Sequence, residues 1–223
     1  MSTTPQTGPS PIQSFHPLIQ TAWTGLVTGV LHTMTGPDHL ASLAPLTIGR
    51  SRVQSALLGA LWGAGHGTGQ LLLGSIFLLF KENIEHLLPL LSRWSGTLVG
   101  LILVLIGAHG LHESLLPIDG EAMEFTSYIG TYINGFTFGL QPDALMMILP
   151  ALALPSRAAA ASFLGAFLLG TIAAMATYAA GIGAASEALG KRMPWLTQRL
   201  SQISGIVAIL LGLFFVVTNV LGL

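Results

Sequence analysis

Long apolar stretches, separated by short polar segments, dominate the sequence. A helix that crosses a membrane needs ~20 apolar residues, and three longer stretches contain no Asp, Glu, Lys or Arg: residues 53–80, 158–186 and 200–223. Residues 94–111 are apolar apart from His109, and residues 16–35 and 125–154 are apolar with polar residues near a proline. The pattern predicts an all-α integral membrane protein with six transmembrane helices over these ranges.

The composition agrees with a protein that lies in the lipid bilayer. Hydrophobic residues make up 52% of the chain and charged residues 8%, whereas soluble domains carry ~25% charged residues. The formal net charge of −1 gives no basis for a nucleic-acid partner. The chain has no cysteine, which excludes disulfides and thiolate metal ligands.

Two polar segments flank the predicted helices of the first half. Residues 1–15 form a tail rich in Pro, Ser and Thr, and residues 113–125 form a loop that carries Asp119, Glu121 and Glu124. With six transmembrane helices, five of the Lys and Arg residues fall on one side of the membrane and three on the other. The positive-inside rule therefore predicts that both termini lie outside and that the acidic loop is cytoplasmic.

The two halves of the chain resemble each other when one is shifted by 105 residues, so that Pro37 meets Pro142 and Asp38 meets Asp143. The string GPDHLASLAP corresponds to QPDALMMILP, and each is followed at the same spacing by Ser-Arg. Each copy holds three predicted helices, and an odd number inverts the second copy relative to the first, as in many secondary transporters. The sequence thus predicts two inverted three-helix repeats, residues 16–112 and 126–223, whose first helices are interrupted by proline.

The first predicted helix contains His32, Asp38 and His39 around the break at Gly36-Pro37. An ionisable group inside a membrane span costs roughly 2.5–3.5 kcal/mol and is by default a functional candidate. Proline breaks the helical hydrogen-bond ladder, and such breaks are tolerated where they face protein or a water-filled cavity. Imidazoles and a carboxylate suit a divalent transition metal. The alternative is that Asp38 caps a helix beginning at His39 while the histidines hydrogen-bond to neighbours.

His66 lies in the middle of the second predicted helix, within the glycine-rich string WGAGHGTGQ. A lone buried histidine is usually a hydrogen-bonded core residue, but the neighbouring His/Asp motif favours a ligand or a proton carrier. Asp143 is the expected contribution of the second repeat, with helix capping as the alternative. Ala144 stands where His39 would be, so the second half should donate fewer ligands. Its further candidates are Gln141, Met146 and Met147.

A second polar group, His109, His112 and Glu113, lies at the end of the third predicted helix. Its two imidazoles are three residues apart and share one helical face. The group is a candidate for collecting or releasing metal at the mouth of the protein. An ordinary polar interface is the favoured interpretation.

The two histidine motifs, HTMTGPDHLA and WGAGHGTGQ, resemble the nickel/cobalt transporter superfamily. The chain looks most like the urease-accessory-type branch of this superfamily, which includes plastid and cyanobacterial "high-affinity nickel-transport" relatives. The second-half string GLQPDALMMILPALALPSR also resembles the plastid-type relatives. The resemblance runs from about residue 16 onward. It implies that His32, Asp38, His39 and His66 handle the metal, in a bacterial or cyanobacterial plasma membrane or a plastid membrane. The well-studied permeases have four residues between His and Asp-His where this chain has five, and they have more spans.

These observations together predict a transporter of a divalent transition-metal cation rather than an enzyme. Nickel or cobalt is the expected substrate, and iron(II) is an alternative. No prosthetic group is expected. The sequence does not decide whether the protein forms a homo-oligomer. The cation would be bound by His32, Asp38, His39 and His66, with Asp143 from the second repeat. Access would alternate around the two proline breaks. Neutral imidazole is the metal-binding form, so a proton should compete with the metal for the site. Coupling of transport to a proton gradient is therefore a hypothesis. Metal flux that does not depend on the pH of the loading side would contradict it.

The sequence is also compatible with two other functions. An intramembrane metalloenzyme would use the cluster to activate water, although inverted repeats are unnecessary for such chemistry. A non-transporting accessory protein would deliver metal to a partner docked on the acidic loop. Neither alternative accounts for the paired proline-aspartate breaks as well as transport does.

Overall fold

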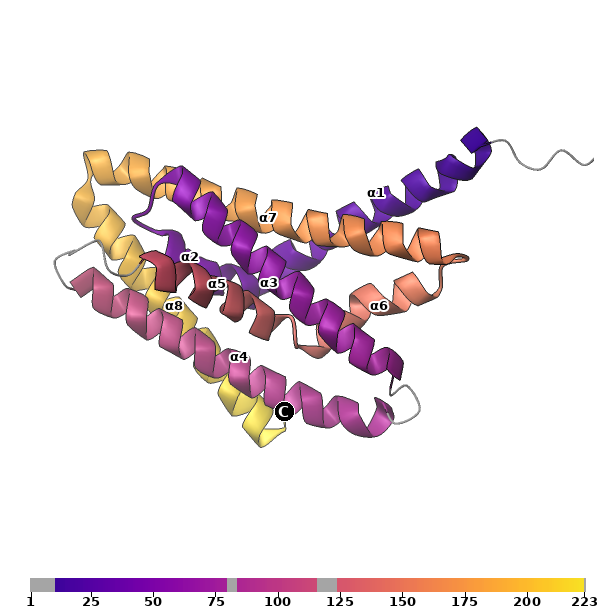
Figure 1. Ribbon diagram of the computed structural model, residues 1–223. Helices are drawn as coiled ribbons and strands as arrows, with labels where there is room; N and C mark the ends of the chain where they lie inside the picture. Colours follow the sequence, from indigo (N-terminus) through magenta and orange to yellow (C-terminus); the bar gives the residue numbers. More distant parts are fainter. Residues whose placement is uncertain (1–10, 80–83, 116–123, 223) are drawn as a thin grey trace, which may run out of the picture.

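The structure, a computed structural model, describes residues 11–79, 84–115 and 124–222, and throughout these ranges the chain forms helices joined by short connections (Figure 1). Most of the polar tail and of the acidic loop lies outside the described residues. In chain order, the elements are α1 (Pro11–Thr35), α2 (Pro37–Thr47), α3 (Arg52–Leu79), α4 (Ile84–Leu115), α5 (Glu124–Phe138), the 3₁₀ helix η2 (Pro142–Ala144), α6 (Leu145–Leu152), α7 (Arg157–Arg192) and α8 (Pro194–Leu221).

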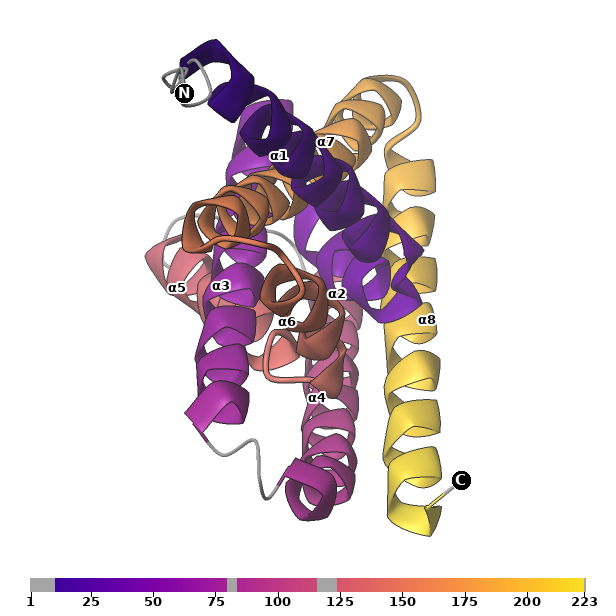
Figure 2. The same cartoon turned by 90° about the vertical axis from the view of Figure 1, so that its right-hand side faces the viewer.

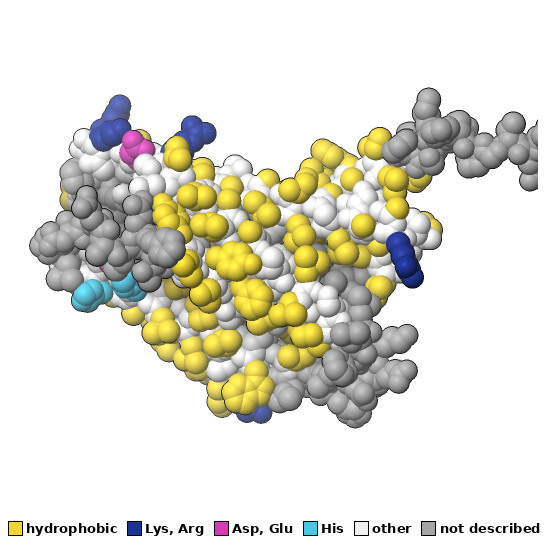
Figure 3. Space-filling view, viewed as in Figure 1, with side chains coloured by type: hydrophobic (Ala, Val, Ile, Leu, Met, Phe, Trp, Pro, Cys, Tyr) yellow, Lys and Arg dark blue, Asp and Glu magenta, His cyan; other side chains and the backbone are white. Residues whose placement is uncertain are grey.

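Three helices in the described ranges are long and apolar enough to cross a membrane: Leu91–Leu115, Arg157–Arg192 and Trp195–Leu221. In Figure 3, hydrophobic side chains cover the middle of the face shown, and the charged side chains and histidines lie toward its edges. Apolar helices with such a surface indicate insertion into a membrane. The other three predicted spans correspond to α1, α3 and the α5–α6 pair. Polar residues or chain breaks interrupt their apolar sequence, and six spans remain a prediction.

Both first helices of the sequence repeats are broken at a proline, as predicted. Gly36 is extended (φ −80°, ψ 107°) and Pro37 begins α2, while Gln141 is extended (φ −73°, ψ 154°) and Pro142 begins η2. The physical reason is the same at each break, because a proline ring disfavours helical conformation in the residue before it and is itself well suited to the first position of a helix.

The element boundaries follow the 105-residue shift. α2 ends at Thr47 and α6 at Leu152, and α3 begins at Arg52 and α7 at Arg157. The repeated Ser-Arg pair explains the last match, since Ser51 Oγ accepts a hydrogen bond from the backbone of Gln54 at 3.3 Å and Ser156 Oγ accepts one from Ala159 at 3.1 Å. Each serine therefore caps the helix that starts at the following arginine.

The same helix pairs are obtained when each helix is replaced by its counterpart in the other half of the chain. α1 packs against α7, and its counterpart α5 packs against α3, the counterpart of α7. α3 also packs against α7, and α4 packs against α8. Figures 1 and 2 show that α1 crosses α7, and Figure 2 shows α4 running beside α8.

Glycines bring α4 and α8 into backbone contact. A Cβ on Gly100 would meet the carbonyl of Gly212, and a Cβ on Gly107 would meet that of Gly205. Because residue numbers rise along α4 while they fall along α8, the two helices are antiparallel. The shift of 105 residues converts one glycine pair into the other, since 100 + 105 = 205 and 107 + 105 = 212.

Replacing Gly107 with alanine should destabilise the protein, because its new Cβ would press on the backbone of α8. Overpacking of this kind typically costs about 1–3 kcal/mol. Gly181→Ala is the matched control, since nothing lies within 4 Å of a Cβ at that position of α7, and its higher helix propensity should make it neutral or stabilising by up to about 1 kcal/mol. Thermal unfolding of both variants in detergent measures the difference. Equal unfolding midpoints would contradict the tight α4–α8 contact.

Candidate metal centre

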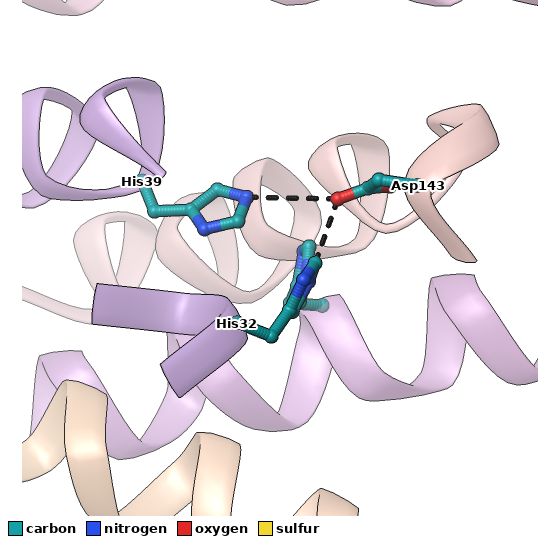
Figure 4. Close-up of side chains that lie close together, drawn as sticks. His32, His39 and Asp143 are labelled. Carbon is teal, nitrogen blue, oxygen red and sulfur yellow. Dashed lines mark hydrogen bonds and ion pairs between the residues drawn. The ribbon is translucent and has the colours of Figure 1, made fainter. Parts of the chain in front are cut away.

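Four side chains with metal-binding atoms converge where the broken helices meet α3. His32 lies in the last turn of α1, His39 in the first turn of α2, His66 in the middle of α3, and Asp143 in η2. One nitrogen or oxygen atom from each residue lies within 4.8 Å of the others. Figure 4 shows His32 and His39 from the first half directed at Asp143 from the second. We call these four residues the His/Asp group.

Three separations within the His/Asp group match those of atoms that share one cation, and all four atoms lie within 4.8 Å of one another. His32 Nε2 lies 3.3 Å from His66 Nε2 and 3.4 Å from Asp143 Oδ2, and His39 Nε2 lies 4.0 Å from Asp143 Oδ2. Nitrogen and oxygen ligands about 2.1 Å from a transition-metal ion lie roughly 3.0–4.2 Å from one another in tetrahedral or octahedral geometry. The residues present therefore fit a divalent cation.

Hydrogen bonding alone accounts poorly for the contacts of His32. As the amide of Gln70 lies, its Nε2 is a donor 3.1 Å from His32 Nε2, whereas a carboxylate oxygen of Asp143 is an acceptor 3.4 Å from the same atom. One imidazole nitrogen either donates or accepts a hydrogen bond, so it cannot satisfy both neighbours. A cation would instead use the lone pairs of His32 and Asp143 together.

Aromatic and backbone contacts fix the orientation of the imidazoles. His39 Nδ1 lies 3.4 Å from the carbonyl oxygen of Thr33, which leaves Nε2 for the His/Asp group, as in many metal-binding histidines. The buried ring of Trp62 stacks on His66 with centroids 5.0 Å apart. Phe138 packs against His39 with centroids 6.3 Å apart.

Burial differs within the His/Asp group. The His66 side chain is fully buried and His39 is nearly so, while the side chains of His32 and Asp143 are 8% and 26% exposed. Asp143 is therefore the most accessible member.

Asp38 does not join this group. Its Oδ2 accepts a hydrogen bond from Gln141 Nε2 at 3.3 Å, and its position in the first turn of α2 is favourable for a negative charge. The residue that follows the first proline break is thus bonded to the residue that precedes the second. Of the two aspartates proposed from the sequence, the structure brings Asp143 to the three histidines, while Asp38 connects the two broken segments.

The other candidates from the sequence lie elsewhere. His109 pairs with Glu113 on α4 at 3.4 Å, and both of these side chains and that of His112 are exposed, outside the His/Asp group. The side chains of Met146 and Met147 are not among those that the structure describes.

Gln70 is a residue of the site that the sequence analysis missed. It is fully buried, and its amide reaches His32. One signal was available, because Gln70 follows His66 by four residues and so lies on the same face of a helix.

Comparison with known proteins finds similarity over most of the chain. The chain is 45% identical over 223 aligned residues to chloroplast protein FOR GROWTH AND FERTILITY 1 of Arabidopsis thaliana, covering 92% of this chain and 60% of that protein. It is 49% identical over 218 residues to FOR GROWTH AND FERTILITY 2 of the same plant, covering 92% and 58%. It is 26% identical over 208 residues to urease accessory protein UreH of Bacillus sp. (strain TB-90), covering 86% and 88%.

These similarities support the superfamily resemblance stated from the histidine motifs, but not a particular branch. The chain spans about three fifths of the length of the two plant proteins. None of the three is named as an enzyme. No family model and no solved structure matches the chain. The similarity to UreH and the His/Asp group together indicate a metal-related membrane protein.

The two aspartates provide a test of this geometry. Asp143→Asn should weaken Ni²⁺ binding by about tenfold or more, because it removes the carboxylate of the His/Asp group, whereas Asp38→Asn should weaken it by about threefold or less. Loss of a residue that bonds a metal ligand typically costs 10–100-fold. Asp38 instead bonds Gln141, which is not in the His/Asp group, so we expect only a small effect of Asp38→Asn on binding. Equilibrium titration of detergent-purified protein measures both. Equal losses would place Asp38 among the ligands and contradict the geometry.

Proposed function

We propose that this protein transports a divalent transition-metal cation across a membrane and binds it at His32, His39, His66 and Asp143. The observation that carries the proposal is the convergence of four metal-binding atoms, from both halves of the chain, beside two helix breaks. Broken helices at matching positions of two repeats are typical of substrate sites in secondary transporters. A cation bound there would be the substrate, and the protein's own residues would supply the whole site.

We further propose six membrane crossings in two inverted repeats. The first repeat would comprise α1–α2, α3 and α4, and the second α5–α6, α7 and α8. Three features support this arrangement: the matching element boundaries, the helix pairing that survives exchange of the halves, and the antiparallel contact of α4 with its counterpart α8.

The distribution of ligands suggests how the site would load and release its cation. Three imidazoles belong to the first half, and the single carboxylate belongs to the second. A movement of η2 relative to α1 and α3 would therefore withdraw the negative charge and leave three neutral donors. The hydrogen bond between Asp38 and Gln141 ties the two breaks together, so it would couple the movement of one break to that of the other.

The donor set limits the choice of cation. Imidazole suits nickel, iron, copper and zinc, whereas sites built from carboxylate, carbonyl and water suit magnesium, calcium and manganese. Three imidazoles and a carboxylate therefore favour a transition metal. The superfamily resemblance favours nickel or cobalt, with iron(II) as the alternative.

The names of the relatives keep a second function open. UreH is named as a urease accessory protein, which favours a membrane protein that hands metal to a partner without transporting it. The plant proteins are named for growth and fertility, which describes an effect on the organism. An intramembrane enzyme has no comparable observation in its favour.

Metal flux into sealed proteoliposomes tests the proposal. Wild-type protein should give saturable uptake of one or two cations among Ni²⁺, Co²⁺, Fe²⁺, Mn²⁺ and Zn²⁺, and His66→Ala and Asp143→Asn should reduce it at least tenfold. His112→Ala is the control, because this exposed histidine lies outside the His/Asp group, and it should retain wild-type flux.

Three outcomes separate the functions. Flux that survives both site variants would place the site elsewhere. Metal binding without any flux would support the accessory function. Conversion of a substrate by detergent-purified protein, where no compartments exist, would instead support an enzyme.

A further inference from the structure

The amide of Gln70 lies against the His/Asp group in an orientation that packing does not explain. Its Nε2 is 3.1 Å from His32 Nε2. Its Oε1 is buried and accepts no hydrogen bond from the part of the chain that the structure describes. Leaving a buried acceptor unsatisfied typically costs about 1–3 kcal/mol, so an apolar side chain would be more stable at this position.

The second half of the chain shows what packing alone requires there. Under the shift of 105 residues, Met175 is the counterpart of Gln70, since 70 + 105 = 175. Met175 is fully buried and belongs to an apolar cluster with Leu43, Trp62 and Phe138. An unbranched apolar side chain therefore serves the equivalent position, and the amide in the first half calls for another explanation.

We infer that Gln70 Oε1 is a fifth ligand and that it determines which cation the site prefers. This inference rests on the proposed function only for the role of the cation as substrate. Turning the amide by half a revolution exchanges its two polar atoms and places Oε1 where Nε2 now lies, beside His32. The turn removes a donor from the His32 lone pair and brings Oε1 within reach of a cation bound to His32, while Nε2 takes the buried place that Oε1 held. Without a cation, Nε2 donates to His32; with a cation, Oε1 binds it.

A fifth donor changes the selectivity of the site. Zn²⁺ is satisfied by four ligands in tetrahedral geometry, and the three imidazoles with Asp143 already provide four. Cations that take five or six ligands gain a further bond from the amide oxygen, and Ni²⁺ and Co²⁺ are of this class. Because raw affinity does not set the selectivity of sites for divalent first-row metals, selection against zinc must come from geometry and ligand type.

Equilibrium titration of detergent-purified protein with Ni²⁺, Co²⁺ and Zn²⁺, each alone, tests the inference. Gln70→Leu should lower the affinity for Ni²⁺ and Co²⁺ about tenfold or more and that for Zn²⁺ less than threefold. Gln70→Glu, which keeps an oxygen at the same place, should preserve the preference for Ni²⁺ over Zn²⁺. Bound Co²⁺ supplies a second readout, because its visible absorption intensifies when it becomes four-coordinate, as we expect in Gln70→Leu.

Equal losses for all three cations, or an unchanged Co²⁺ spectrum, would reduce Gln70 to a structural role and overturn the inference. Thermal unfolding of each variant shows whether the fold is retained, and the spectrum of the bound fraction decides the question even in a less stable variant. Titration requires no sealed compartment. Failure of wild-type flux would therefore remove the transport proposal without affecting this result.

A different observation points to a route by which the site is reached. A cleft of ≈ 400 Å³ lies between the end of α2, α4 and α5. Its polar lining residues are Arg50, His109, Glu113, Thr131, Asn134 and Thr137. Asn134 is only 6% exposed, and neither polar atom of its amide has a hydrogen-bond partner among the described residues. A buried amide of this kind needs water or a ligand in the cleft.

Residues that follow the cleft lining in sequence belong to the apolar cluster that packs against the His/Asp group. Thr137 lines the cleft, and the next residue, Phe138, is fully buried with its ring against His39. Leu43 and Leu103 belong to the same apolar cluster as Phe138, and Leu103 follows Ile102 of the cleft. We propose that the cleft is an aqueous route from one membrane face for a hydrated divalent cation, closed at its inner end by Leu43, Leu103 and Phe138.

The absence of cysteine from the chain makes this proposal directly testable. Asn134→Cys and Thr137→Cys should react with a charged, water-soluble methanethiosulfonate at least tenfold faster than Ile129→Cys, because the reagent attacks a thiolate, which forms in water. Ile129 is the control, since it is exposed on α5 outside the cleft. Reaction of both cleft positions as slowly as the control would show that lipid fills the cleft and would overturn the proposal. Reactivity is measured without metal flux, so it stands apart from the test of transport.

Discussion

A proline nitrogen carries no hydrogen, and the residue before a proline is disfavoured in helical conformation. At Gly36-Pro37 and Gln141-Pro142 this constraint ends one helix and begins another in the middle of an apolar segment. The site depends on these two ends. His32 lies just before the first break and His39 just after it, so a straight helix would carry them seven residues, or about 10 Å, apart. Instead their rings are in edge contact, with centroids 5.4 Å apart.

Competition for one nitrogen atom characterises the centre of the site. His32 Nε2 has Gln70 Nε2, His66 Nε2 and Asp143 Oδ2 within 3.4 Å, and these neighbours make opposite demands on its proton. Burial sharpens the conflict, because few water molecules can reach His39 or His66 to satisfy what the protein leaves unpaired. A cation accepts the lone pairs of His32, His66 and Asp143 at once, which is the physical argument for metal binding in this group.

The remainder of the fold holds the two breaks opposite each other. α3 packs against both α5 and α7, so it brings His66 to the junction of the halves. Glycine-to-carbonyl contacts lock α4 to α8 with backbone against backbone, and interlocked surfaces of this kind resist sliding. Under the proposed function, movement would therefore concentrate in the short segments α2, η2 and α6, which the Asp38–Gln141 hydrogen bond connects.

The sequence by itself determined the features of this protein that depend on local chemistry. The apolar helices and the two proline breaks follow from residue types and spacing, because these features act within one helix or one turn, and the 105-residue correspondence is read directly from the sequence. His32, His39 and His66 were candidates because of two sequence motifs and their resemblance to a known superfamily, but their convergence from α1, α2 and α3 was decided by the packing of the helices. Only the tertiary structure decided which aspartate faces the histidines. Asp38 and Asp143 are equivalent by sequence, yet Asp38 is held by Gln141 while Asp143 reaches His32. The contact of Gln70 with His32 and the exposed position of His109 were also decided there, because side chains from different helices meet only when the packing angle and the rotation of each helix are set.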